Sequence, residues 1–230
     1  MRNKTTTEVL EAIAKIPSRP SNALPAPLFQ PTVDNQTVFS NYSAMSDAHA
    51  FSPIPYLAGN TDHEFGYYAI SAFAAGEAFS GAQVELFEIE GFNCPTARET
   101  AARAAAGVPT WRYRYFGNWT NLELYPGSGA YHGTDISMVF GTAQDISGLP
   151  NTAAESQLSR LMMKAWATFA SDPQEGLSNT MGWPKYNASG TTLVGLGYAG
   201  NPQAIFTEPV IYNQVCDLFG DYKGDSEGAF

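Results

Sequence analysis

Apolar residues recur at helical spacing through residues 155–170, and this stretch is the longest helix that the sequence predicts. A separation of three or four residues places side chains on one face of a helix. The residues with this spacing are Leu158, Leu161, Met162, Ala165, Trp166 and Phe169. A stripe of methionine and aromatic side chains is typical of a face packed into a core.

A second pattern combines a helix with a strand. Residues 95–106 are rich in alanine, with Pro95 at the start and Gly107 just past the end. Proline at the first turn and glycine after the last are common at helix ends. The next nine residues, 108–116, are rich in β-branched and aromatic side chains and predict a strand. A loop rich in glycine, proline and asparagine follows over 117–131.

The remaining elements are predicted from shorter signals. Thr5 and Glu8 have the capping-box spacing of a helix that should end before Pro17. Five prolines make 17–35 an extended connector. The other expected elements are a strand at 54–59, helical structure over 65–79, a strand near 192–196 and a last helix at 208–219.

Strands and helices therefore alternate, and the fold class is α/β. Both main strands end in polar loops, where such folds place their chemistry. Two core strands cannot make a sheet of the usual width of about five or six strands. We therefore expect the chain to form part of a larger sheet.

Composition and charge exclude several classes of partner. The chain has 230 residues, of which 44% are hydrophobic, and its formal net charge is −10. It has no cluster of Lys and Arg, which argues against nucleic acid as a partner, and the acidic balance argues against anionic lipid. No apolar run is long enough for a membrane span, and the polar first residues do not form a signal peptide.

Cysteines and glycosylation motifs favour a secreted protein. Asn-x-Ser/Thr motifs begin at Asn3, Asn35, Asn41, Asn118 and Asn187. Cys94 and Cys216 lie far apart and fit no metal-binding spacing. In an oxidising compartment they could form a disulfide. The alternative is two buried thiols in a cytosolic protein.

His132 and Glu64 are the candidate catalytic residues. His132 stands between glycines in the loop after the 108–116 strand, and Glu64 follows the 54–59 strand. A triad histidine and its acid occupy such positions in α/β-hydrolases, where the carboxylate orients the imidazole. A loop histidine can also be a surface residue. Glu64 or Asp62 can simply face the start of a helix.

Two segments give the chain a specific resemblance. Residues 59–68 (GNTDHEFGYY) resemble the acid-bearing segment of the type-B carboxylesterases, the family of cholinesterases and fungal lipases. Residues 129–141 (GAYHGTDISMVFG) resemble the histidine motif of that family. The order of the segments at 94–95, 111–116, 172–173 and 182–186 is also similar.

The resemblance implies a fold, a reaction and a set of residues. The chain would be the C-terminal part of an α/β-hydrolase fold, with its last core strands and their packing helices. It would serve a serine esterase that transfers an acyl group from a carboxylic ester to water, without a metal or organic cofactor. Glu64 would be the acid and His132 the base, and Cys94 and Cys216 would form a disulfide.

The chain departs from the family in length and in its nucleophile. Family members are more than twice as long, and their Gly-x-Ser-x-Gly motif and oxyanion hole precede the acid. One such pentapeptide occurs here, at 224–228 around Ser226, but it comes after His132 and follows no strand. We therefore expect Ser226 not to be the nucleophile. Residues 1–35 would be a helix and connector, and 36–230 the part that carries acid and base.

Several possibilities stay open from the sequence. The chain could supply acid and base to a complementary N-terminal esterase segment and be inactive alone. It could be a truncated gene product, or a non-catalytic esterase-like module for binding or adhesion. In a further alternative, Ser226 near the C-terminus is the nucleophile after all. In the first two cases we expect the isolated chain to expose a sheet edge and apolar surface and to aggregate.

Overall fold

The computed structural model describes residues 3–16 and 31–216. Its centre is a four-stranded sheet in the order β1-β2-β3-β4. The strands are β1 (Tyr56–Thr61), β2 (Thr110–Tyr115), β3 (Leu193–Leu196) and β4 (Ile205–Thr207). The first three run parallel and β4 is antiparallel to β3. This mixed sheet, with helices between its parallel strands, confirms the α/β class.

Strand β2 shows how the sequence divides the sheet into two faces. Successive side chains of a strand point to opposite faces. Trp111 and Tyr115 belong to the main hydrophobic cluster on one face. The arginines between them, Arg112 and Arg114, face the other side and bind Asn93, the last residue before α6. Both arginines are buried, so each needs the polar partners that this face supplies.

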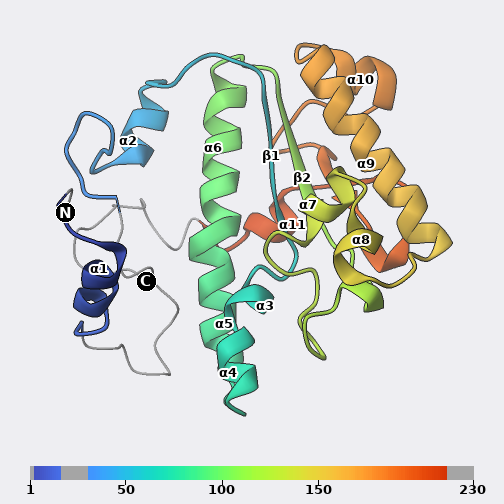
Figure 1. The fold of residues 1–230 in the computed structure, drawn as a ribbon. Helices are drawn as coiled ribbons and strands as arrows, with labels where there is room; N and C mark the ends of the chain where they lie inside the picture. The colour runs from blue at the N-terminus through green and yellow to red at the C-terminus, as the bar shows by residue number, and fades with distance from the viewer. Residues whose placement is uncertain (1–2, 17–30, 217–230) are drawn as a thin grey trace.

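Helices cover both faces of the sheet (Figure 1). The helix α6 (Cys94–Ala105) packs on β1 and β2 from one side. On the other side lie α7 (Thr134–Val139), α9 (Ala153–Ser171) and α10 (Gly176–Met181), with the short α8 (Ala143–Ser147) beside them. The apolar face of α9 fills the core, where Leu158, Met162 and Ala165 have no exposed surface. Burying a side chain of the size of Leu or Met contributes about 1.5–3 kcal/mol.

One unbroken helical run leads into α6. It begins with α5 (Gly81–Glu88), continues as a π-helix (Ile89–Asn93) and becomes α6 at Cys94. A capping box of Ser80 and Gln83 starts the run, and Gly107, with φ of 74°, follows its end. A π-helical turn accommodates one more residue than an α-helical one and often occurs at functional sites. Two short helices, α3 (Phe65–Tyr68) and α4 (Ile70–Ala74), precede the run.

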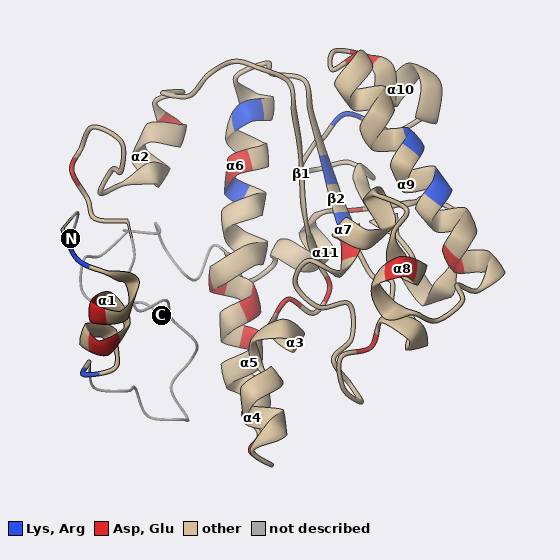
Figure 2. Cartoon of the chain, in the orientation of Figure 1, with Lys and Arg blue, Asp and Glu red and all other residues tan. Residues whose placement is uncertain are grey.

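The outer elements lie beyond α6 in Figure 1. They are α1 (Thr6–Ile13), with the capping box of Thr5 and Glu8, and α2 (Tyr42–Asp47), capped by Asn41. Acidic residues are spread over several elements, among them α1, α6 and α9 (Figure 2). The only helix described after β4 is α11 (Val210–Asn213).

The structure corrects several details of the sequence prediction. The helical structure expected over 65–79 consists of two short helices and ends at Ala74, and the helical run at 81–93 and the strand β4 were not predicted. The last helix ends at Asn213 within the described residues, although 208–219 was expected to be helical. Most of the proline-rich connector and the Ser226 pentapeptide lie outside the described residues. The strands at 56–61, 110–115 and 193–196 and the long helix confirm the prediction.

Candidate active site

Glu64 lies in the turn that follows β1, and its carboxylate is buried. Its side chain is 3% exposed. The oxygen Oε1 accepts a hydrogen bond of 2.6 Å from the backbone N–H of Thr61, at the end of the strand. The other oxygen, Oε2, lies 2.6 Å from Nδ1 of His132. Both oxygens therefore have a partner, as a buried carboxylate requires.

His132 lies in the loop between β2 and α7, and its side chain is 46% exposed. Its backbone N–H also points to the carbonyl of Glu64, at 3.4 Å. Gly133, with φ of 84°, turns the chain directly into α7. Within the described residues, Nε2 of His132 makes no hydrogen bond. When Nδ1–H donates to Glu64, Nε2 is the nitrogen left to accept a proton.

The pKa of His132 is raised above its usual value. The hydrogen bond to Glu64 is the main cause, and the negative charges of Glu64 and Asp135 add to it, whereas partial burial of the ring opposes it. A carboxylate that both orients an imidazole and stabilises its protonated form suits a general base.

Asp135, three residues after His132, occupies the first turn of α7 and is buried. Its carboxylate accepts a hydrogen bond of 2.9 Å from the hydroxyl of Tyr113 on β2. Burial raises the pKa of Asp135 and also that of Tyr113. This contact connects the histidine loop to the central strand. Asp135 therefore supports the loop, and its negative charge helps to raise the pKa of His132.

Aromatic rings surround the imidazole of His132 on one side. The ring centroids of Phe92, Tyr68 and Tyr67 lie 5.2, 5.5 and 6.3 Å from that of His132. Phe92 comes from the π-helix and the two tyrosines from α3. Such rings restrict the imidazole and favour its cationic form. Sequence analysis did not connect these aromatic residues with the site.

A second carboxylate–histidine pair adjoins the first. Nδ1 of His63 lies 3.3 Å from Oε1 of Glu88, the last residue of α5. Glu88 also accepts hydrogen bonds from the backbone N–H groups of Glu64, at 3.1 Å, and Phe65, at 2.9 Å. The sequence analysis missed Glu88, although the capping box at Ser80 and Gln83 was a signal for its helix.

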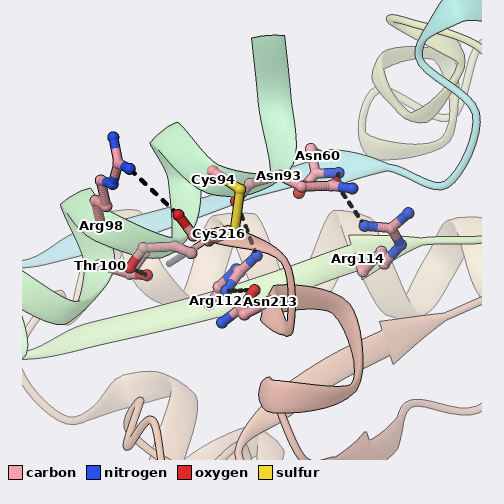
Figure 3. Close-up of a disulfide and its surroundings, with 10 residues drawn as sticks. Asn60, Asn93, Cys94, Arg98, Thr100, Arg112, Arg114, Asn213 and Cys216 are labelled. Atoms are coloured by element: carbon pink, nitrogen blue, oxygen red, sulfur yellow. Dashed lines mark hydrogen bonds between the residues drawn. A yellow bond between two sulfur atoms is a disulfide. The ribbon is translucent and has the colours of Figure 1, made fainter. Parts of the chain in front are cut away.

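Cys94 and Cys216 form a disulfide that ties the start of α6 to the end of the described chain (Figure 3). Arg98 donates to the carbonyl of Cys216, and Arg112 donates to Asn213 just before it. The adjoining Arg114 binds Asn93 and Asp62. Asp62 therefore pairs with an arginine and does not take part in the contact with His132.

The glycosylation candidates differ in exposure. Asn35, Asn118 and Asn187 are exposed, whereas Asn41 is half-buried and caps α2. Among the described residues no group of three or more His, Cys, Asp or Glu side chains has the arrangement of a metal site. No helix in the described part of the chain is both long enough and apolar enough to cross a membrane.

A mostly parallel sheet with helices on both faces defines an α/β protein, and a buried carboxylate in contact with a loop imidazole lies at the ends of two of its strands. The profile of the carboxylesterase family matches residues 74–211, and the chain belongs to that family. The matched residues include His132 and Cys94, whereas Glu64 lies before them and Cys216 after them.

Curated relatives agree with this family. The chain is 38% identical to secreted lipase 5 of Gibberella zeae over 160 aligned residues. The alignment covers 66% of the chain and 29% of the lipase. The chain is 34% identical over 176 residues to chlorogenic acid esterase of Aspergillus niger, covering 76% of the chain and 33% of the esterase. Acetylcholinesterase of Bungarus fasciatus is 31% identical over 131 residues, 56% of the chain and 21% of the enzyme. The chain thus spans a third or less of the length of these relatives.

Proposed function

We propose that this chain supplies the acid and the base of a serine carboxylic-ester hydrolase. Glu64 would be the acid and His132 the base. The observation that carries the proposal is the 2.6 Å contact from the buried Glu64 carboxylate to Nδ1 of a half-exposed imidazole. This arrangement leaves Nε2 free to take a proton from a hydroxyl nucleophile and to return it to the leaving alcohol.

The nucleophilic serine and the oxyanion hole would belong to a complementary esterase segment. In the proposed fold the chain forms the last core strands and packing helices of an α/β-hydrolase. Residues 1–35 would be a helix and a proline-rich connector before residues 36–230, the part that carries acid and base. The segment would continue the sheet beside β1, which lies at its edge and whose first four residues are only half-buried.

The substrate would be a small carboxylic ester, and the location extracellular. The names of the two fungal relatives, a secreted lipase and an esterase, support this substrate class and location. The disulfide and the exposed Asn35, Asn118 and Asn187 are consistent with an oxidising, glycosylating compartment. The aromatic side chains Tyr67 and Phe92 at His132 would provide an apolar wall for the ester.

Complementation tests the proposal. The chain is mixed or co-expressed with the serine-bearing segment of a carboxylesterase, and hydrolysis of p-nitrophenyl acetate and labelling by a fluorophosphonate are measured. We expect both activities to require the two partners and to be lost with His132→Ala. Hydrolysis that survives His132→Ala would refute the role of His132.

The same assay on the chain alone separates the alternatives. Labelling of Ser226 that is abolished by His132→Ala would place the nucleophile in this chain. A failure of every serine-bearing partner to restore hydrolysis would favour a binding module.

A further inference from the structure

The carboxylate of Glu88 binds the segment that carries the proposed catalytic acid. Glu88 is 8% exposed, and it reaches three consecutive residues of the turn after β1. Its oxygens accept the N–H groups of Glu64 and Phe65, at 3.1 and 2.9 Å, and lie 3.3 Å from Nδ1 of His63. Glu88 is 24 residues from Glu64 in the sequence, so the contact is tertiary and not part of a local turn.

The turn needs this acceptor because its own side chains are engaged elsewhere. Glu64 is the residue before α3 and has helical backbone angles, and its side chain makes no capping bond. That side chain is directed instead at Thr61 and His132. Glu64 and Phe65 are each 2% exposed, so their N–H groups are shielded from water. Leaving one such group unpaired would cost about 1–3 kcal/mol.

The backbone of Glu64 also determines where its carboxylate lies. Two contacts join this residue to the histidine loop, one from Oε2 to Nδ1 of His132 and one from its carbonyl to the N–H of His132. A shift of the Glu64 backbone would therefore lengthen both contacts together. Buried hydrogen bonds that fix the position of a functional side chain tune its chemistry in the same way as the outer partners of metal ligands.

The π-helix adds a second connection from the same helical run. Phe92, four residues after Glu88, places its ring 5.2 Å from that of His132. The run from α5 into the π-helix thus reaches the acid through Glu88 and the base through Phe92.

We propose that Glu88 is a positioning residue, which holds the backbone of Glu64 so that its carboxylate meets Nδ1 of His132. The assignment rests on the proposed function of the Glu64–His132 pair. It gives His63 a subordinate role as a third partner of Glu88 rather than that of an alternative base.

Two variants separate positioning from charge. Glu88→Gln removes the charge and one acceptor, and Glu88→Asp keeps the charge but shortens the side chain by one methylene group. The matched control is Glu85→Gln, which removes an exposed carboxylate from the same helix. The readouts on the full chain are the downfield proton resonance of His132 Nδ1–H and the pKa of His132, both followed by NMR.

We expect both Glu88 variants to weaken or broaden the Nδ1–H resonance and to lower the pKa of His132 toward its ordinary value. Glu85→Gln should leave both unchanged. If Glu88→Asp behaves as the wild type while Glu88→Gln does not, Glu88 acts through charge and the positioning role is wrong. If neither variant changes the resonance, the role is also wrong.

A measurement on the wild type protects the test against variants that do not fold. In the wild type the amide protons of Glu64 and Phe65 should both exchange slowly with solvent, because each is bonded to the buried carboxylate of Glu88. Rapid exchange of either amide in the folded chain would overturn the proposal.

These NMR arms do not require hydrolysis, so they can succeed even if the chain proves not to be an esterase. In an active assembly, Glu88→Gln should lower kcat by up to about a hundredfold with little change in KM, because a small misplacement of the acid affects the transition state most. An equal loss of kcat with Glu85→Gln would count against a specific role of Glu88.

Discussion

The two carboxylate–histidine pairs of this chain combine the same chemical groups in different arrangements. In the Glu64–His132 pair the carboxylate gives one oxygen to a backbone N–H and the other to the imidazole, at 2.6 Å. In the Glu88–His63 pair both oxygens accept backbone N–H groups, and the imidazole is a looser third partner at 3.3 Å. A histidine near a buried carboxylate is therefore not enough to identify a base. What distinguishes the pairs is how the carboxylate divides its acceptor sites.

The largest expected difference between the pairs is in catalysis. In a complemented assembly, Glu64→Gln should lower kcat by about 10⁴-fold, because the amide stabilises the wrong tautomer of His132 and not its protonated form. His63→Gln should lower kcat less than tenfold, since Glu88 keeps both backbone partners. Steady-state hydrolysis of p-nitrophenyl acetate measures both values. Equal losses in the two variants would remove the distinction between the pairs.

Removing the disulfide should destabilise the helical run that carries Glu88 more than the rest of the fold. Cys94 follows the π-helix directly, so its bond to Cys216 holds the run that carries Glu88. The two cysteines are 122 residues apart, and closing a loop of that length stabilises the folded state by about 5 kcal/mol in the chain-entropy view. We expect the double variant Cys94→Ser/Cys216→Ser to lose up to that free energy of unfolding, measured by urea denaturation.

The loss of stability in the disulfide-free chain should be largest next to Glu88. Hydrogen exchange in the disulfide-free chain should accelerate at Glu64 and Phe65, whose amides Glu88 binds, more than at Phe140 at the end of α7. The wild type under reducing conditions provides the matched control. A uniform acceleration would mean that the disulfide stabilises the whole fold and not this side of the site.

The elements that the sequence predicted well are those with a repeating local pattern. The long helix α9 has its apolar residues on one face, and β2 alternates tryptophan and tyrosine with arginine. By contrast, β4 has three residues and pairs antiparallel at the sheet edge, so it has no pattern of its own. The helical run from Gly81 could not be predicted because glycines at 81 and 91 are unfavourable in helices and the π-helical turn does not follow the α-helical period.

The site residues likewise differ in whether a local sequence pattern marks them. Glu64 and His132 follow strands that could be recognised, and their segments resemble a known family, so both became candidates. Glu88 is one of three glutamates at 85, 88 and 90, and the sequence does not distinguish it from the others. Only tertiary packing brings it to the amides of Glu64 and Phe65. Partners that recognise backbone groups leave little trace in sequence patterns.

Two glycines near the pairs offer a smaller perturbation. A Cβ at Gly129 would lie 3.0 Å from Cδ2 of His63, and at Gly133 it would lie 3.6 Å from Ile136. Both have positive φ, which costs an alanine about 1–2 kcal/mol. Gly129→Ala also creates a close steric contact with His63. We therefore expect it to destabilise the folded chain by about 2–4 kcal/mol, against about 1–2 kcal/mol for Gly133→Ala.

Thermal or urea unfolding of the two alanine variants measures this difference. Combining Gly129→Ala with His63→Ala should recover part of the additional loss, because the ring of His63 is then absent while its Cβ, at 3.1 Å, remains. If the combination gives no recovery, the contact with His63 is not the source of the cost.

The pH dependence of stability gives the smallest expected effect. The pKa of His132 is raised in the folded chain by Glu64 and Asp135, so the folded state binds the proton more tightly than the unfolded state. This contribution is complete below the unfolded pKa, near 6.5, and is lost as pH rises through the folded pKa. Asp135 changes stability in the same direction at lower pH, because burial raises its pKa as well.

The difference in unfolding free energy between the wild type and His132→Gln isolates the histidine, and it should shrink as pH increases from 5 to 9. Because the imidazole is half-exposed, solvent screening keeps this change small. A difference that stays constant or grows between pH 5 and pH 9 would contradict a raised pKa of His132 through its contact with Glu64.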